Sequence, residues 1–167
     1  MSMPRTIRNF NVFVDGVSYF GRATEAKLPQ PKIQTDAHRG AGMDGPVGID
    51  IGMEGMTAEC TFAEWDPVLL KKLGTQQRLV FRPAQLGEDT VAADTIIATV
   101  GGLITATETG DLKPGQATGA NLKLAVDVRY YRLEINGVEI CEIDIVNAKR
   151  RIGGVDQLAE MRRAMGL

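Results

Sequence analysis

The sequence is poor in aromatic residues, histidine and cysteine. Aromatic residues make up 5% of its 167 residues, and the chain has one histidine and two cysteines. Two cysteines are too few for a disulfide scaffold, and Cys60 and Cys141 lack the spacing of metal ligands. Few aromatic rings together with 19 glycines favour a β protein with many turns over a helical bundle.

Long hydrophobic runs and net positive charge are also missing. The longest charge-free stretch, residues 95–107, is shorter than the roughly 20 apolar residues that span a bilayer. No apolar segment follows the N-terminal residues 1–5, so we expect no secretory signal, no membrane binding and synthesis in a cytoplasm. The net charge of −2 excludes a generally basic nucleic-acid binder, whose affinity would come from Lys and Arg.

The sequence offers little for nucleophilic catalysis. A hydrolytic triad would need His38 beside Cys60, Cys141 or a serine, and the only serines are Ser2 and Ser18. Ser18 lacks the context of a nucleophile elbow. We therefore interpret His38 as a polar loop residue, and we expect no enzyme activity.

Two further patterns fail as ligand sites. Residues 40–45 match G-x-G-x-x-G, but Pro46 and the glycines that follow exclude the helix that a dinucleotide fingerprint needs. Asp44, Asp50 and Glu54 do not have the spacing of a calcium loop. We expect neither a cofactor nor a metal. The carboxylate pair at 142 and 144 and the basic runs at 149–151 and 162–163 are interpreted as solvated or inter-subunit charges.

Alternation of apolar and polar residues predicts a mainly β fold. Asp15-Gly16 and Asn136-Gly137 are hairpin turns between β-rich runs. We expect strands at 56–62, 77–82, 95–107, 122–135 and 138–145, an extended edge at 23–35 and a turn at 111–119. Gly101-Gly102 predicts a bend or bulge, and the apolar phase shifts at Tyr130-Tyr131.

Two helices and one long loop complete the prediction. Residues 66–74 form a short internal helix that Asp66 caps and Gly74 ends, and residues 154–166 form a C-terminal helix. Residues 40–55 hold six glycines and a proline, which predicts a structured loop rather than a strand. The whole chain, 1–167, is then one domain, an antiparallel β-barrel or sandwich.

Four stretches give the chain a family resemblance. They are residues 13–17 (Phe-Val-Asp-Gly-Val), residues 38–47 (His-Arg-Gly-Ala-Gly-Met-Asp, then Pro-Val), residues 130–133 (Tyr-Tyr-Arg-Leu) and residues 154–167. In these stretches the chain resembles the major tail tube protein family of contractile-tailed bacteriophages and R-type pyocins. The stretches extend over nearly the whole chain, and residues 75–94 resemble the family least.

The resemblance implies a structural subunit of a virion tail, assembled in the host cytoplasm. Its copies would form stacked hexameric rings inside a contractile sheath, with a tape-measure protein and then DNA in the lumen and a baseplate at one end. Open sheet edges could pair between neighbouring copies to close such a ring. The alternatives are the tube of a headless pyocin-like particle or of a type VI secretion system. A small-ligand-binding β-barrel or minor enzyme is the rival of another class.

Candidate residues follow from the resemblance and the alternation together. The loop at 40–55 would contact the adjacent ring through Gly42, Met43, Asp44, Val47, Ile49, Ile51 and Met53. The lumen, expected to be polar or acidic and nearly free of Lys and Arg, would be lined by Thr57, Glu59, Thr61, Thr95 and Thr99. The alternative is that this face contacts a neighbouring subunit. Cys60 lies on the core side of its strand. Cys141 is expected to point away from the core side of Val138 and Ile140, either as a partly buried unpaired cysteine or in a disulfide to a neighbouring subunit or to the sheath.

Overall fold

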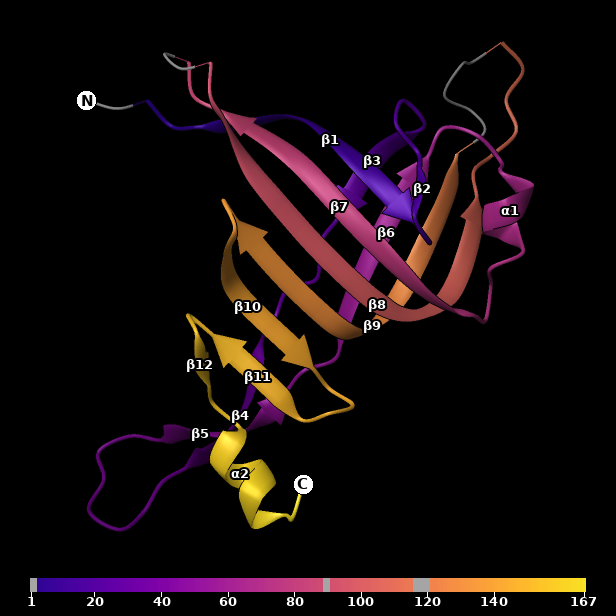
Figure 1. Cartoon of the computed structure of the whole chain (residues 1–167). Coiled ribbons are helices and arrows are strands. Elements are labelled where there is room, and N and C mark those ends of the chain that lie inside the picture. The colour runs from indigo at the N-terminus through magenta and orange to yellow at the C-terminus, as the bar shows by residue number, and fades with distance from the viewer. Residues whose placement is uncertain (1–2, 89–90, 116–120) are drawn as a thin grey trace.

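The computed structural model describes residues 3–88, 91–115 and 121–167 (Figure 1). Expectations that fall on residues 1–2 and on residues 116–119 of the turn at 111–119 lie outside this range. The strands are β1 (Thr6–Val14), β2 (Val17–Ser18), β3 (Ala23–Lys27), β4 (Ile33–His38), β5 (Val47–Met53), β6 (Met56–Phe62), β7 (Gln76–Leu86), β8 (Ala93–Thr109), β9 (Leu122–Ile135), β10 (Val138–Asp144), β11 (Lys149–Ile152) and β12 (Val155–Asp156). The helices are α1 (Pro67–Leu70) and α2 (Ala159–Ala164). The predicted mainly antiparallel β fold is confirmed.

One ten-stranded antiparallel sheet forms the body of the molecule. Eight of its strands follow the order β12-β11-β10-β9-β8-β7-β1-β2, and β6 and β3 form a branch from β9. The long strand β9 is shared between two branches, because residues 122–128 pair with β6 and residues 130–135 pair with β10. Strand β3 pairs with β6 alone, as expected of an edge. In the described chain the sheet curves over the core without closing into a barrel by strand pairing (Figure 1).

The core lies on the inner side of this curved sheet. Its largest fully buried side chains come from β1, β6, α1, β7, β8, β9 and β10, among them Phe62, Leu69, Phe81, Ile104 and Leu124. The predicted alternation of β6 is confirmed, since Met56, Ala58, Cys60 and Phe62 are all buried. Tyr19 closes one end of the core with its ring edge-on to Phe62, at 5.2 Å between centroids.

Both predicted hairpin turns are present. Asp15 and Gly16, and likewise Asn136 and Gly137, have positive φ angles, the backbone form of a two-residue turn between twisted strands. The strand register continues directly from each turn, with Val14 opposite Val17 and Ile135 opposite Val138.

The predicted irregularity at Gly101-Gly102 is a β-bulge. The register of β8 against β9 shifts between these glycines, so that Gly101 pairs with Tyr130 and Gly102 with Val128. Because β9 has an extra residue at the bulge, the alternation of its buried side chains shifts there. Val128 is the last buried residue before the shift, and Tyr131 is the first one after it. This is the phase shift predicted at Tyr130-Tyr131.

Both helices are shorter than predicted. The Asp66 carboxylate caps α1 by accepting from the Val68 amide, but the helix ends at Leu70 rather than near Gly74. The helix expected over 154–166 begins only at Ala159, because Val155 and Asp156 pair with β11 as strand β12. The spacing of apolar residues in this segment is compatible with a helix or with a strand. Pairing with β11 makes Val155 and Asp156 a strand.

The prediction of a loop over residues 40–55 is wrong in its second half. Residues 47–53 are strand β5, which pairs with β4 in a separate two-stranded sheet. A two-stranded ribbon tolerates glycines that a central strand excludes. Gly48 lies against Thr35, and Gly52, at a φ of +128°, adjoins a register shift between Gln34 and Thr35.

Candidate functional site

The β4–β5 hairpin is the most prominent projection of the molecule. It extends from the lower end of the sheet in Figure 1, beside α2. All of β4 is exposed, and Val47, Ile49 and Ile51 of β5 are each 50–55% exposed. Met53, at the base of β5, instead packs against the core. The hairpin therefore presents aliphatic side chains that this chain leaves uncovered, as in surfaces that bind another protein.

The tip of the hairpin, residues 39–46, holds the other predicted contact residues. Gly42 has a φ of +86°, which favours glycine. Met43 folds back over the loop, where its sulfur accepts from the Gly40 amide at 3.1 Å and its carbonyl oxygen from Arg39 Nε at 3.3 Å. Gly42 and Asp44 are exposed. The G-x-G-x-x-G match lies in this tip and leads into a strand, not into a helix.

The base of the hairpin is fixed to the main sheet by one buried arginine. Arg150 of β11 is 7% exposed, and its Nη2 donates to the Asp50 carboxylate of β5 at 2.7 Å. This Arg150 contact and a hydrogen bond from the Gly52 amide lower the pKa of Asp50. The Arg150 carbonyl accepts from the Gln157 amide at 2.8 Å, so the same residue also fixes the lead into α2.

The predicted lumen residues divide between two places in the fold. Thr57, Glu59 and Thr61 lie on β6, opposite residues 123–127 of β9, whereas Thr99 pairs with Arg132 near the other end of β9. Thr57 and Thr95 are exposed. Thr99 is only 8% exposed, which leaves it no surface to present, and we remove it from the candidate set.

The face around Glu59 is also less acidic than expected. Lys123 of β9 lies beside it, with Nζ 3.1 Å from the Glu59 carboxylate, and this contact raises the pKa of Lys123. Lys27 lines the same small hollow together with Glu25 and Thr61. A face with paired charges of both signs still has no net affinity for phosphates.

The two cysteines are both on the core side. Cys60 is buried, and burial raises the pKa of its thiol to about 12. The predicted orientation of Cys141 is wrong. A register shift between Glu139 and Cys141 turns β10, so Cys141 packs against the core while Ile140 is 40% exposed. This orientation removes the basis for a disulfide from Cys141.

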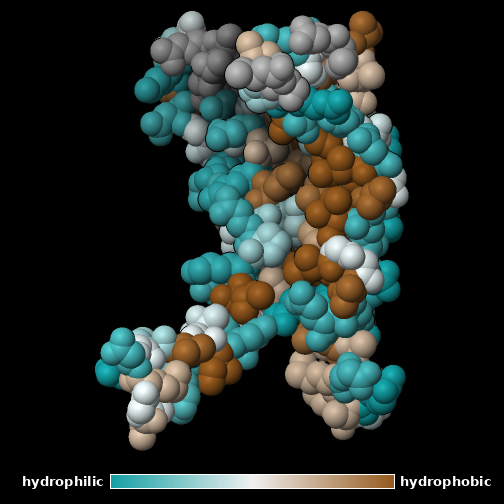
Figure 2. Space-filling model, turned by 90° about the vertical axis from the view of Figure 1, so that its left-hand side faces the viewer, coloured by the Kyte–Doolittle hydropathy of each residue, from teal (hydrophilic) through white to brown (hydrophobic). Residues whose placement is uncertain are grey.

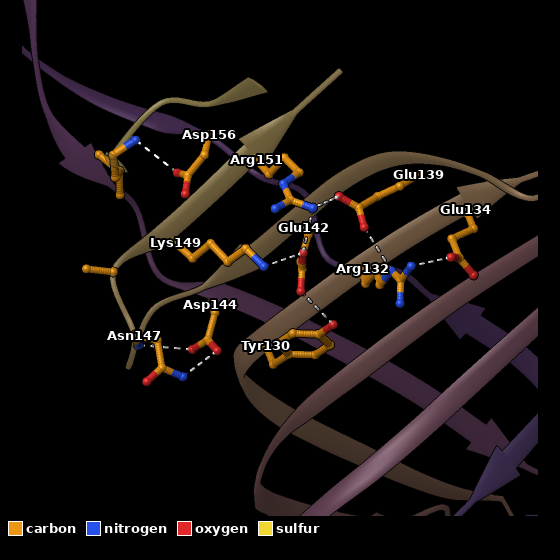
Figure 3. A network of polar contacts seen from close by, with 12 residues as sticks. Tyr130, Arg132, Glu134, Glu139, Glu142, Asp144, Asn147, Lys149, Arg151 and Asp156 are labelled. Carbon is orange, nitrogen blue, oxygen red and sulfur yellow. Dashed lines mark hydrogen bonds and ion pairs between the residues drawn. The ribbon is translucent and has the colours of Figure 1, made fainter. Parts of the chain in front are cut away.

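A charge network that the sequence did not predict covers the outer face of β9, β10 and β11 (Figure 3). Glu142 is its centre. Lys149 Nζ lies 2.8 Å from the Glu142 carboxylate, and the Tyr130 hydroxyl donates to that carboxylate at 3.2 Å. Arg132 contacts Glu134 and Glu139, and Arg151 contacts Glu139 and Glu142.

These contacts lower the pKa of Glu142, with Lys149 as the largest cause. The carboxylates and basic runs interpreted as solvated or inter-subunit charges are thus largely paired within the chain. Cross-strand spacing was the available signal, because Arg151 pairs with Glu142 and Arg132 with Glu142 across adjacent strands.

The described residues contain no arrangement of catalytic or metal-binding type. Within them no group of three His, Cys, Asp or Glu side chains is placed to hold a metal ion. His38 lies on the exposed strand β4, whereas both cysteines pack into the core. Of the helices in the described ranges, none has the length and apolar character to cross a membrane.

Comparisons with known proteins agree on one family. The family model described as phage tail tube protein FII matches residues 4–166. The chain is 32% identical over 186 aligned positions to the tail tube protein of Escherichia phage P2, with all of both chains covered. It is 29% identical over 150 positions to the major tail tube protein of Serratia phage KSP20, covering 88% of this chain and 86% of the relative.

One solved structure supports the fold. A chain in the cryo-EM structure of the anti-feeding prophage (AFP) baseplate, 6-fold symmetrised, matches with a TM-score of 0.54 at 15% identity. The match covers 83% of this chain and all of that chain. At this identity the likeness shows a shared fold alone.

Proposed function

The chain belongs to the phage tail tube protein FII family, and from that premise we propose that its copies form stacked hexameric rings. The stack is the inner tube of a contractile tail, and DNA leaves through its lumen. Because the family consists of structural tail proteins, the chain acts by assembly and not by catalysis. Its location is the virion tail, reached after assembly in the host cytoplasm.

The observation that carries the proposal is the uncovered apolar side of the β4–β5 hairpin. Val47, Ile49 and Ile51 alternate along a ribbon that projects from the body of the subunit. Each half-exposed aliphatic side chain that becomes buried gains about 1 kcal/mol. We place Gly42, Met43, Asp44, Val47, Ile49 and Ile51 at the contact with the adjacent ring, whereas Met53, predicted with them, packs against the core at the base of the hairpin.

Ring closure is supported by open strand edges. Strand β1 pairs with β7 along its length, but β2 covers only residues 13 and 14 on its other side. Strand β3 is the second open edge. Exposed edges of this kind pair with another chain, and pairing around a closed ring removes them.

The remaining partners are proposed from the family. A tail sheath protein would surround the tube, a tape-measure protein would occupy the lumen, and a baseplate would begin the stack. Thr57, Glu59, Thr61 and Thr95 remain the lumen candidates. DNA would pass them without specific binding.

Electron microscopy of the purified chain tests the proposal. At tens of micromolar we expect rings or tubes, with light scattering well above that of an 18.1 kDa species. A baseplate extract or preformed tube ends, added as seeds, control for slow nucleation. A chain that stays monomeric even with seeds contradicts the proposal.

A second candidate is the tube of a headless particle, because the shared fold includes a chain from an anti-feeding prophage. Capsid and terminase genes beside this gene would indicate a phage, and their absence would indicate a headless particle. A ligand-binding barrel is disfavoured, since core side chains fill the concave side of the sheet.

A further inference from the structure

A groove lies between the β4–β5 hairpin and α2. Its volume is about 510 Å³, and its walls include Ile51 and Met53 of β5, Ile145 after β10, and Leu158 and Met161 at α2. Figure 2 shows two projections at the lower end of the molecule with a hollow between them. Helix α2 has no buried residue, and Ile51, Ile145 and Met161 are each about half exposed.

Both walls of the groove are held by ion pairs. Arg150 fixes the hairpin through Asp50, as described above. Arg162 fixes α2, because it donates to the Asp156 carboxylate at 2.5 Å and to the Ala148 carbonyl at 2.9 Å. The groove is therefore preformed in the single subunit, which lowers the entropic cost of binding.

The charges that line the groove already have partners. Asp50 pairs with Arg150, Lys149 with Glu142, and Asp144 accepts from Asn147. No unpaired charge among them selects a charged occupant. The groove instead suits a projecting apolar segment, such as the anchor residues of protein interfaces.

Such a segment lies at the opposite end of the same chain. Figure 1 places α1 and β2 at the upper right, far from α2 and the hairpin. Three exposed apolar residues belong to this end of the chain, Val17 and Phe20 at and after β2 and Val68 in α1, and we call them the apolar corner; Phe20 is 73% exposed. Ion pairs of Arg22 with Glu64 and Asp66 hold its two loops together, so this corner too has its charges paired within the chain.

We propose that the groove of one copy binds the apolar corner of a second copy in the adjacent ring. This rests on the proposed function and specifies its stacking contact. One surface meets a different surface of an identical chain, which is the head-to-tail contact that propagates a stack without end. The Phe20 ring enters the groove, where it meets Met161 and Ile51.

A charge-exchange experiment tests this contact. Phe20→Glu and Met161→Lys each place a charge on an exposed position, so the monomer fold should not change. We expect each single variant to form at least about tenfold fewer stacked tubes than the parent chain, counted by electron microscopy. The double variant should regain tubes, because the new charges attract each other across the contact.

The matched control is Met165→Lys, the same change at the C-cap of the same helix, at a similarly exposed residue outside the groove. It should form tubes like the parent chain. Undiminished tubes in the single variants, or a double variant no better than either single one, would overturn the groove contact. A parent chain that forms neither rings nor tubes would instead contradict the proposed function, and the contact with it.

Discussion

Among the glycines of the described residues, Gly102 has the least space for a side chain. A Cβ atom at this position would lie 2.1 Å from the Asp127 carbonyl oxygen and 2.9 Å from a Val126 methyl group. At Gly101 the nearest atom would be the Tyr130 Cβ, at an ordinary 3.4 Å. The bulge thus needs glycine at the second position because two backbones approach each other there, and not because of a positive φ.

We therefore predict that Gly102→Ala destabilises the subunit by about 3 kcal/mol or prevents folding, through overpacking against backbone. Gly101→Ala, its neighbour, should change the free energy of unfolding by less than about 1 kcal/mol. Urea denaturation of both variants measures the difference. Equal stabilities would contradict the proposed crowding.

The cysteines give a second test at this scale. A thiol with a pKa of about 12 is neutral at pH 8, and Cys60 is also inaccessible. A thiol reagent should leave Cys60 unmodified in the folded chain and react with it after unfolding. Burial also raises the pKa of Cys141, so this half-buried thiol should react slowly. Mass spectrometry of a Cys141→Ser variant isolates the Cys60 signal, and rapid labelling of folded Cys60 would contradict the prediction.

Among the elements, local signals were predictable and pairing over long distances was not. Asp15-Gly16 and Asn136-Gly137 specify their turns through residues that accept positive φ, and the alternation of β6 follows from one buried face. The sequence did not show that residues 47–53 pair with β4, because glycines argue against a strand that has neighbours on both sides. Strand β5 pairs with β4 alone, so its glycines are tolerated. It also did not show the register shift before Cys141, where no glycine marks the irregularity.

The candidate contact residues were partly predictable for the same reason. The aliphatic alternation at 47–53 was visible in the sequence, whereas the groove was not. Its walls come from β5, β10 and α2, and Arg150 contacts Asp50 across 100 positions of sequence. Only the folded chain brings these residues together.

The exposed side chains of the hairpin should contribute to stacking and not to the stability of the subunit. We predict that the triple variant Val47→Ser, Ile49→Ser, Ile51→Ser keeps the melting temperature of the parent within a few degrees, since these side chains are largely exposed. The same variant should lose stacked tubes. Calorimetry and electron microscopy give the two measurements, and tubes of normal length would exclude the hairpin from the stacking contact.

The attachment of α2 should depend on pH. Arg162 and the Leu158 amide lower the pKa of Asp156 to about 2, below its ordinary value of 3.8. A lowered folded-state pKa stabilises the contact above the ordinary pKa, and that stabilisation is lost as the pH falls toward 2.

The protection of the amides of residues 159–165 against exchange, relative to the unfolded chain, should therefore fall between about pH 4 and pH 2 before the core unfolds. Asp156→Asn should show fast exchange already at neutral pH. If the exchange rates of both chains followed the same pH dependence, Asp156 would not be the group that holds α2.

At the scale of the whole molecule, the charges that line the groove and those beside the apolar corner are paired within the subunit, and apolar side chains remain exposed at both ends. Attraction between subunits therefore depends on apolar burial, which salt does not screen. We predict that tube formation does not weaken when sodium chloride rises from about 0.05 M to about 0.5 M. Tubes that dissolve at the higher concentration would show that ion pairs between subunits dominate.

The position of β9 in the sequence determines when the chain can fold during translation. It is the partner of β6, β8 and β10, yet it begins at residue 122. A nascent chain that has emerged only as far as β8 leaves β6 without its main neighbour, and the core around Leu124 and Val126 is incomplete. Folding must wait until residues 122–135 have left the ribosome, and such distant strand pairing is slow. A newly made chain therefore exposes its apolar strands to the cell until β9 has emerged and paired.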